Sequence, residues 1–245
     1  MEIKTYKRDF EYSYTLGAFP TFELVKAMPE KVIEVFVHSS FTDMEKLEKL
    51  CERQNVRLTV NDRTINRLSD KGNVFVVGVF EKYVQDIDRQ KSHIVLVNPS
   101  DMGNLGTIIR TAAGFGITDM AIIEPAADSF NPKTVRASMG SLFRIRHRRF
   151  DSYAEYAGYT GIPLKGGRGE NGRQVFTFML NGENPLNVNN CPKPGLFSLV
   201  FGNEATGLPQ EFLEYGTSII IPQSGLVDSL NLTIAAGVGL YMFTH

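Results

Sequence analysis

The sequence is poor in residues that bind metals. It contains two cysteines and four histidines among 245 residues. Cys51 and Cys191 form no closely spaced motif, which argues against a zinc site or a disulfide framework and predicts reduced thiols in a cytoplasmic protein. The histidines are scattered along the chain and offer no ligand cluster. We therefore expect a protein that works without a metal.

Long apolar runs and a strong net charge are also missing. The longest apolar stretch, LTIAAGVGLYMF at 232–243, is shorter than the roughly 18 residues that a membrane span needs. The opening MEIKTYKRDFEYSY has no apolar segment of the signal-peptide kind, so we expect no membrane partner. The net charge is −1 and the pI about 6.4. A nucleic-acid partner would therefore need a local basic surface.

Strand and helix patterns alternate along the chain and predict an α/β fold. Apolar runs at 32–37 and 74–80 are typical of strands, and Thr42 with Glu45 suggests a capping box before a helix at 44–54. The alternation restarts after a polar stretch near residue 90, which predicts a largely parallel sheet covered on both faces. We expect a small domain at 1–90 and a larger one at 91–245.

The run NPSDMGNLGTIIRTAAGFGI, at 98–117, follows a predicted strand. Gly103 and Gly106 predict a turn before a helix at 105–115, and Arg110 would lie one turn inside that helix. Free N–H groups at a helix start and an arginine fork suit an anion such as phosphate. The alternative is a plain glycine turn with an exposed arginine.

Two further polar loops follow predicted buried strands. LVFGNEATGLPQEF spans 199–212 and IIIPQSGLVDSLNLTIAAG spans 219–237. Ligands in open α/β sheets bind at the carboxyl ends of the strands, where both loops would lie. The simpler interpretation makes Glu204 a loop carboxylate and Ser229 a helix N-cap.

Taken together, these runs resemble the three signature motifs of the SpoU–TrmH branch of the SPOUT methyltransferases. GNLGTIIRTA at 103–112, FGNEATGL at 201–208, and IPQ at 221–223 with SLNLTIAAG at 229–237 occur in the order of the family. The resemblance covers residues 91–245 closely. It implies an α/β catalytic domain with a trefoil knot, and residues 1–90 resemble the small α/β RNA-binding domain that many of these enzymes carry.

The resemblance also implies the activity, which is transfer of a methyl group from S-adenosylmethionine to a ribose 2′-hydroxyl of structured RNA by a homodimer. Ribosomal RNA is favoured and transfer RNA is the alternative; the nucleotide is not specified. By motif matching, the cofactor contacts are Gly202, Ile221 and Leu230. The catalytic positions are Asn104, Arg110, Glu204, Ser229 and Asn231.

The role of Arg110 has two interpretations. The family casts the matching arginine as the general base. A guanidinium has a pKa above about 12 and stays protonated, which favours phosphate binding and stabilisation of developing alkoxide charge. Both interpretations need the arginine at the ribose.

A local basic run, KTVRASMGSLFRIRHRR at 133–149, predicts contact with the RNA backbone. The alternative is a solvated strand edge. The basic residues concerned are Lys133, Arg136, Arg144, Arg146, Arg148 and Arg149.

Two other functional classes compete with the methyltransferase. An RNA-binding relative without catalysis is disfavoured because the five catalytic positions are intact. A dinucleotide-dependent enzyme is disfavoured because GGRGENG, at 166–172, precedes a predicted strand where the dinucleotide fingerprint requires a helix.

Overall fold

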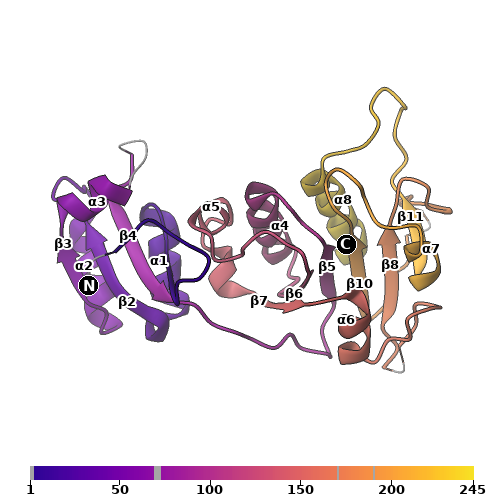
Figure 1. Cartoon of the computed structure of the whole chain (residues 1–245), viewed down its shortest axis with the longest axis horizontal. Coiled ribbons are helices and arrows are strands. Elements are labelled where there is room, and N and C mark those ends of the chain that lie inside the picture. The colour runs from indigo at the N-terminus through magenta and orange to yellow at the C-terminus, as the bar shows by residue number, and fades with distance from the viewer. Residues whose placement is uncertain (1–2, 69–72, 170, 190) are drawn as a thin grey trace. The chain divides into compact units, whose positions relative to one another are not determined.

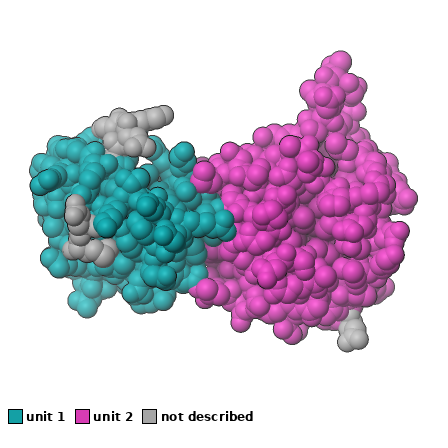
Figure 2. All heavy atoms as spheres, in the orientation of Figure 1, with its two compact units in different colours: residues 1–83, 128–144 teal, residues 84–127, 145–245 magenta. Residues whose placement is uncertain are grey.

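The computed structural model describes residues 3–68, 73–169, 171–189 and 191–245. The chain divides into two compact units (Figure 2). Unit 1 comprises residues 1–83 and 128–144, and unit 2 comprises residues 84–127 and 145–245. Residues 128–144 therefore belong to unit 1 together with the N-terminal residues. A single domain boundary in the sequence cannot produce such a unit. The domain ranges 1–90 and 91–245 stay a prediction.

Unit 1 is a small α/β unit around a mixed sheet of order β1-β4-β2-β3 (Figure 1). Strand β4 runs antiparallel to β1 and β2, whereas β3 runs parallel to β2. Its elements are β1 (Tyr12–Tyr14), α1 (Ala18–Ala27), η1 (Pro29–Lys31), β2 (Val32–Val37), α2 (Met44–Arg53), β3 (Leu58–Val60), α3 (Asp62–Leu68), β4 (Val76–Glu81), α5 (Pro132–Ala137) and η2 (Ser141–Arg144).

The sequence predicts most of unit 1 but not all of its local chemistry. The strand at 32–37 coincides with β2. The expected capping box is wrong, because Asp43 and not Thr42 precedes α2 and, in the described structure, makes no side-chain capping bond. Helix α2 is held instead by its apolar face, where Leu47 and Cys51 are buried.

Unit 2 contains a parallel sheet of order β7-β6-β5-β10-β8-β11-β9. Every neighbouring pair in this order is parallel. Its elements are β5 (His93–Val97), α4 (Met102–Gly114), β6 (Asp119–Ile123), β7 (Arg146–Phe150), α6 (Tyr153–Thr160), β8 (Gln174–Phe178), β9 (Asn184–Pro185), β10 (Phe197–Phe201), α7 (Phe212–Tyr215), β11 (Thr217–Ile220) and α8 (Leu232–Thr244).

Helices cover both faces of this sheet, as the alternation predicts. On one face, Phe197 of β10 packs against Phe243 of α8, and α4 lies beside α8 (Figure 1). On the other face, Val200 of β10 joins Tyr156 of α6 and Phe212 of α7 in one buried cluster. Side chains alternate between the two faces along a strand, so β10 contributes to both layers.

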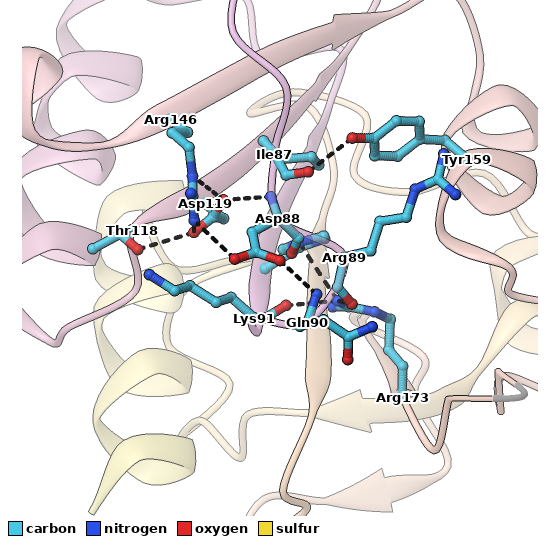
Figure 3. Close-up of polar contacts among 11 residues, drawn as sticks. Ile87, Asp88, Arg89, Gln90, Lys91, Thr118, Asp119, Arg146, Tyr159 and Arg173 are labelled. Atoms are coloured by element: carbon cyan, nitrogen blue, oxygen red, sulfur yellow. Dashed lines mark hydrogen bonds and ion pairs between the residues drawn. The ribbon is translucent and has the colours of Figure 1, made fainter.

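The segment that leads into β5 forms polar contacts with the rest of unit 2 (Figure 3). The backbone N–H of Asp88 donates to Asp119 at 2.8 Å. The fully buried guanidinium of Arg173 donates to the backbone carbonyls of Arg89 and Lys91, at 3.0 and 2.6 Å. These bonds satisfy buried donors and fix the amino end of β5.

Candidate active site

Three polar loops of unit 2 lie at the same edge of its sheet. They follow β5, β10 and β11, which are all parallel to their neighbours. Residue Phe201 of β10 is in register with Leu96 of β5, so these two strands end level with each other. The carboxyl edge of an open parallel sheet is where α/β proteins bind ligands. The prediction that the loops after β10 and β11 lie at the carboxyl ends of their strands is confirmed, and the loop after β5 lies at the same edge.

Glu204 joins the loop after β10 to the loop after β5. Its carboxylate accepts hydrogen bonds from the backbone N–H and the hydroxyl of Ser100, at 3.0 and 2.8 Å, and from the N–H of Asp101 at 3.2 Å. The side-chain amide of Asn104 donates to the same carboxylate at 3.3 Å. Glu204 therefore has a defined structural role, and Ser100 is a site residue that the sequence analysis missed.

These hydrogen bonds keep Glu204 ionised. Burial by itself raises the pKa of this carboxyl, but hydrogen bonds from the backbone and hydroxyl of Ser100 and from the backbone of Asp101 outweigh burial. The net result is a pKa below the ordinary glutamate value. A side chain that holds its proton so weakly, with its oxygens already bonded to donors, is suited to positioning the loops and poorly suited to accepting a proton at neutral pH.

Asn203 supports the same junction. Its side-chain amide donates to the carbonyl of Asn98 at 2.8 Å, and its side-chain oxygen accepts from the N–H groups of Ala205 and Thr206, at 2.9 and 3.2 Å. Asn98 adopts a positive φ of 54°. Asparagine tolerates this left-handed conformation better than most residues do, so the chain can turn sharply at the end of β5.

A hollow of about 350 Å³ lies between the loops after β10 and β11. All three predicted cofactor residues line it, together with Glu204 and Ser229. A side chain at Gly202 would place its Cβ 2.2 Å from the backbone carbon of Gly207, so only glycine fits where these two segments of one loop approach. The predicted cofactor contacts are Gly202, Ile221 and Leu230.

The predicted glycine turn before Arg110 is wrong. Helix α4 begins at Met102, so Gly103 and Gly106 lie inside its first two turns. Asp101 is the N-cap, and its side chain accepts from the N–H of Asn104 at 2.7 Å. The signal for this earlier start is the aspartate itself, because Asp is among the favoured N-cap residues.

Arg110 and Asn104 lie on this helix in different environments. Asn104 is half-buried and bonded to Glu204, whereas Arg110 is exposed and forms no ion pair with any of the described residues. Neither residue lines the hollow. The exposed guanidinium of Arg110 is thus available to an anion from outside the chain.

The two catalytic candidates before α8 also differ in role. Asn231 is the N-cap of α8, and its side-chain oxygen accepts from the N–H and hydroxyl of Thr233 at 2.8 and 2.6 Å. Ser229 is exposed, lines the hollow and does not cap the helix. The interpretation of Ser229 as an N-cap is therefore wrong.

Four arginines of the basic run are paired with carboxylates. Arg144 bonds Glu23, Arg146 bonds Asp119, Arg148 bonds Asp86 and Arg149 bonds Glu124. By contrast, Lys133 and Arg136 are exposed and have no carboxylate partner within the part of the chain that the structure describes. RNA contact by the whole run stays a prediction. The geometry favours Lys133 and Arg136 as the residues that would make it.

The described residues contain neither a cluster of metal ligands nor a membrane-spanning helix. Among these residues, three or more histidine, cysteine, aspartate or glutamate side chains never gather closely enough to hold a metal ion. None of the described helices has the length and apolarity needed to cross a bilayer.

The larger, C-terminal part of the sequence is similar to a known family. Residues 91–241 match the model of the SpoU rRNA Methylase family. The chain is 32% identical over 144 residues to the 23S rRNA (guanosine(2553)-2'-O)-methyltransferase RlmP of Bacillus subtilis, which covers 58% of this chain and 53% of that protein. The chain spans about half the length of the first curated relatives it matches, at 53% and 51%.

Two further similarities extend over nearly the whole chain. The 23S rRNA (guanosine-2'-O-)-methyltransferase RlmB of Acinetobacter baylyi is 25% identical over 249 residues, which cover 94% of this chain and 95% of that protein. The crystal structure of an AdoMet-bound rRNA methyltransferase from Sinorhizobium meliloti is 27% identical with a TM-score of 0.71, and covers 95% of this chain and 86% of that one.

Proposed function

The chain belongs to the SpoU rRNA Methylase family, and from this premise we propose that it transfers a methyl group from S-adenosylmethionine to a ribose 2′-hydroxyl of ribosomal RNA. One observation carries the proposal. Glu204 ties together two of the three motif loops at the sheet edge, and the hollow beside it is lined by the residues expected to hold the cofactor. Two relatives named as 23S rRNA 2'-O-methyltransferases support ribosomal RNA as the substrate.

The hollow has features that suit this cofactor. Its wall combines apolar side chains such as Ile221 and Leu230 with the bare backbone of Gly202, which lets a ligand approach closely. When bound, the cofactor supplies an activated methyl group on a sulfonium. The remaining task of the protein is to place the ribose oxygen in line with that methyl group and to stabilise the charge that develops.

The catalytic residues divide this task. Arg110, exposed on α4, would bind the phosphate next to the target ribose and stabilise alkoxide charge through its planar fork. Glu204 positions the loops, and Asn104 is held by it. Ser229 faces the hollow and is free to orient the ribose or the cofactor, while Asn231 fixes the start of α8.

Three finer features belong to the same proposal. The homodimer is supported by an unusually apolar outer face of α8, where Ile234 and Tyr241, seven residues apart, are 56% and 55% exposed. The trefoil knot is supported by the position of β10 between β5 and β8 in the sheet. The cytoplasmic location stays a prediction.

The proposal can be tested with the purified chain, labelled S-adenosylmethionine and ribosomal RNA from a strain that lacks the gene. We expect calorimetry to detect cofactor binding, and the label to enter the RNA as a 2′-O-methyl nucleotide. Chelators should leave the reaction intact. Absence of cofactor binding, or label found on a base, would contradict the proposal.

A further inference from the structure

Unit 1 contains a second hollow, which lies between α1 and α2. It has a volume of about 460 Å³, within the range of pockets that hold small ligands. Its lining contains four basic residues, the carboxylate of Glu45 and one aromatic ring. The residues that matter are Phe22 and Lys26 of α1 with Lys46, Lys49 and Arg53 of α2, and we call these five residues the α1–α2 groove.

The charges of α2 are segregated by sign. Lys46, Lys49 and Arg53 recur at spacings of three and four residues, which places them along one side of the helix. The glutamates of α2 follow the same spacing one residue earlier, about 100° around the helix. Lys46, Lys49 and Arg53 all line the groove, and of the three glutamates of α2 only Glu45 does. The helix therefore presents three cations and one carboxylate to the groove.

Nearby carboxylates neutralise only some of the cations of the groove. Lys49 bonds Glu45, and Lys26 bonds Glu23 at 3.1 Å. Glu23 also accepts from Arg144, so this one carboxylate is shared between two cations. A net positive charge remains in and beside the groove.

The two remaining cations of the groove lack a carboxylate. Lys46 and Arg53 are both exposed, and neither forms an ion pair with another residue for which the structure gives a position. The ammonium of Lys46 lies 5.3 Å from the centre of the Phe22 ring, a cation–π distance that holds it over the groove. These two cations are the ones available to an outside anion.

We propose that the α1–α2 groove binds the phosphate backbone of the substrate RNA, with Lys46 and Arg53 as its principal phosphate contacts. This inference rests on the proposed function, which supplies RNA as the partner. A cationic groove with an aromatic side chain is the arrangement that proteins use to follow a nucleic-acid strand. The chain as a whole has a net charge of −1, so a local concentration of unpaired cations is the surface on which such binding depends.

The test compares two double variants of the full chain. Lys46→Ala with Arg53→Ala removes the two unpaired cations of the groove. The matched control, Lys7→Ala with Arg63→Ala, removes two exposed cations that belong to the same unit but do not line the groove. Binding of unmodified ribosomal RNA is measured over a range of salt concentrations by filter retention, with inorganic phosphate as a competitor.

We expect the groove variant to lower the log–log salt slope by about 1.4–1.8, because each lost phosphate contact removes about 0.7–0.9. Raising the salt concentration from about 50 to 200 mM should then weaken RNA binding by the groove variant about 7–12-fold less than it weakens RNA binding by the wild type. The control should keep the wild-type slope. The groove variant should also raise the KM for RNA and leave the affinity for S-adenosylmethionine unchanged.

The two proposals fail in different ways. A groove variant with the wild-type salt slope and KM, in a protein that still methylates RNA, would overturn the groove and leave the proposed function standing. Wild-type protein that binds RNA through the groove but transfers no methyl group would overturn the function alone. Inorganic phosphate that, at matched ionic strength, weakens RNA binding equally in the wild type and the groove variant would place the phosphate contacts outside the groove and count against the RNA proposal.

Discussion

The carboxylate of Glu204 accepts a hydrogen bond from the backbone N–H of Ser100 at 3.0 Å, although the two residues are 104 positions apart in the chain. This bond closes the candidate site, because it joins the loop after β10 to the loop after β5. The same carboxylate also bonds the start of α4 through Asp101 and Asn104. The position of the helix that carries Arg110 therefore depends on Glu204.

Replacing Glu204 should disturb the site more than its exposure suggests. In Glu204→Gln, an amide group replaces an acceptor oxygen and faces the donors of Ser100. We expect kcat/KM to fall about 10–100-fold, since a hydrogen bond to a charged group contributes about 1.5–3 kcal/mol. Glu183→Gln is the control, because Glu183 is exposed and lies outside the hollow. Wild-type turnover by Glu204→Gln would contradict the positioning role.

Gly202 should tolerate no side chain. In Gly202→Ala, the new Cβ would lie 2.2 Å from backbone, so the loop must open and distort the hollow. We expect the Kd for S-adenosylmethionine, measured by calorimetry, to rise at least about tenfold, a cost of about 1.4 kcal/mol. The control is Gly195→Ala, where a Cβ meets nothing within 4 Å. Equal cofactor affinity in the two variants would show that the hollow does not hold the cofactor.

Arg110 should matter for turnover and not for folding. Its side chain is exposed and has no ion pair within the described chain, so Arg110→Ala should change the free energy of unfolding by less than about 0.5 kcal/mol. Methyl transfer should be lost while cofactor affinity is kept. Arg110→Lys should also fail, because lysine lacks the planar fork. Arg168→Ala, another exposed arginine of unit 2, serves as the control. Substantial activity in Arg110→Lys would refute phosphate binding by the fork.

How far the sequence predicts this site depends on the range of the interactions. Short-range patterns place β2 and the strand before the run at 98–117 correctly, because side-chain periodicity reports directly on the buried face. The start of α4 is misplaced because glycine is a strong turn signal, and here the Asp101 cap outweighs it. The bond between Ser100 and Glu204 has no local signal at all. It exists only because the sheet order brings β5 and β10 together.

The basic run also shows that contacts between distant segments decide what a sequence pattern does. A cluster of arginines in sequence predicts a positive surface, but their partners come from other segments. Arg146 forms two hydrogen bonds with the fully buried Asp119, at 2.7 and 2.8 Å, from a neighbouring strand. Whether a charge is available for RNA is therefore decided by tertiary structure.

Arg146→Ala should consequently lower stability. Asp119 would keep only Thr118 and the N–H of Asp88 as donors for a buried carboxylate. We expect the free energy of unfolding to fall by about 1.5–3 kcal/mol, measured by urea denaturation. Lys133→Ala and Arg136→Ala should each change it by less than about 0.5 kcal/mol. The opposite ranking would mean that the bond between Arg146 and Asp119 contributes nothing to stability.

The fold should also lose stability in acid through His93. This fully buried ring bonds the carbonyl of Asp88 through Nε2 at 2.8 Å and the Tyr156 hydroxyl through Nδ1 at 2.9 Å. A carbonyl only accepts, so Nε2 carries the proton and Nδ1 accepts from Tyr156. Burial, assisted by the charge of Arg173, lowers the pKa of His93 from 6.5 to about 4.

The sign of the pH effect follows from that lowered pKa. Between pH 6.5 and 4, the unfolded chain binds a proton at His93 and the folded chain does not, so acid favours unfolding. The contribution to the free energy of unfolding is fully present above pH 6.5 and falls by about 3 kcal/mol towards pH 4. His93→Gln can make both hydrogen bonds but cannot titrate, so its urea stability should depend less on pH. An unchanged pH dependence would contradict this account.

The most direct test of the account concerns the atom that receives the methyl group. The motif loops offer an arginine, hydroxyls, amides and glycines, and their one aromatic residue, Phe201, is buried in β10 against Phe178. This composition suits a ribose and its phosphates, whereas base methylation needs a pocket that stacks and reads a base. The measurement is methyl incorporation into RNA that carries one 2′-deoxy nucleotide at the mapped target. We predict that incorporation at that nucleotide is abolished, and label still entering it would contradict ribose methylation.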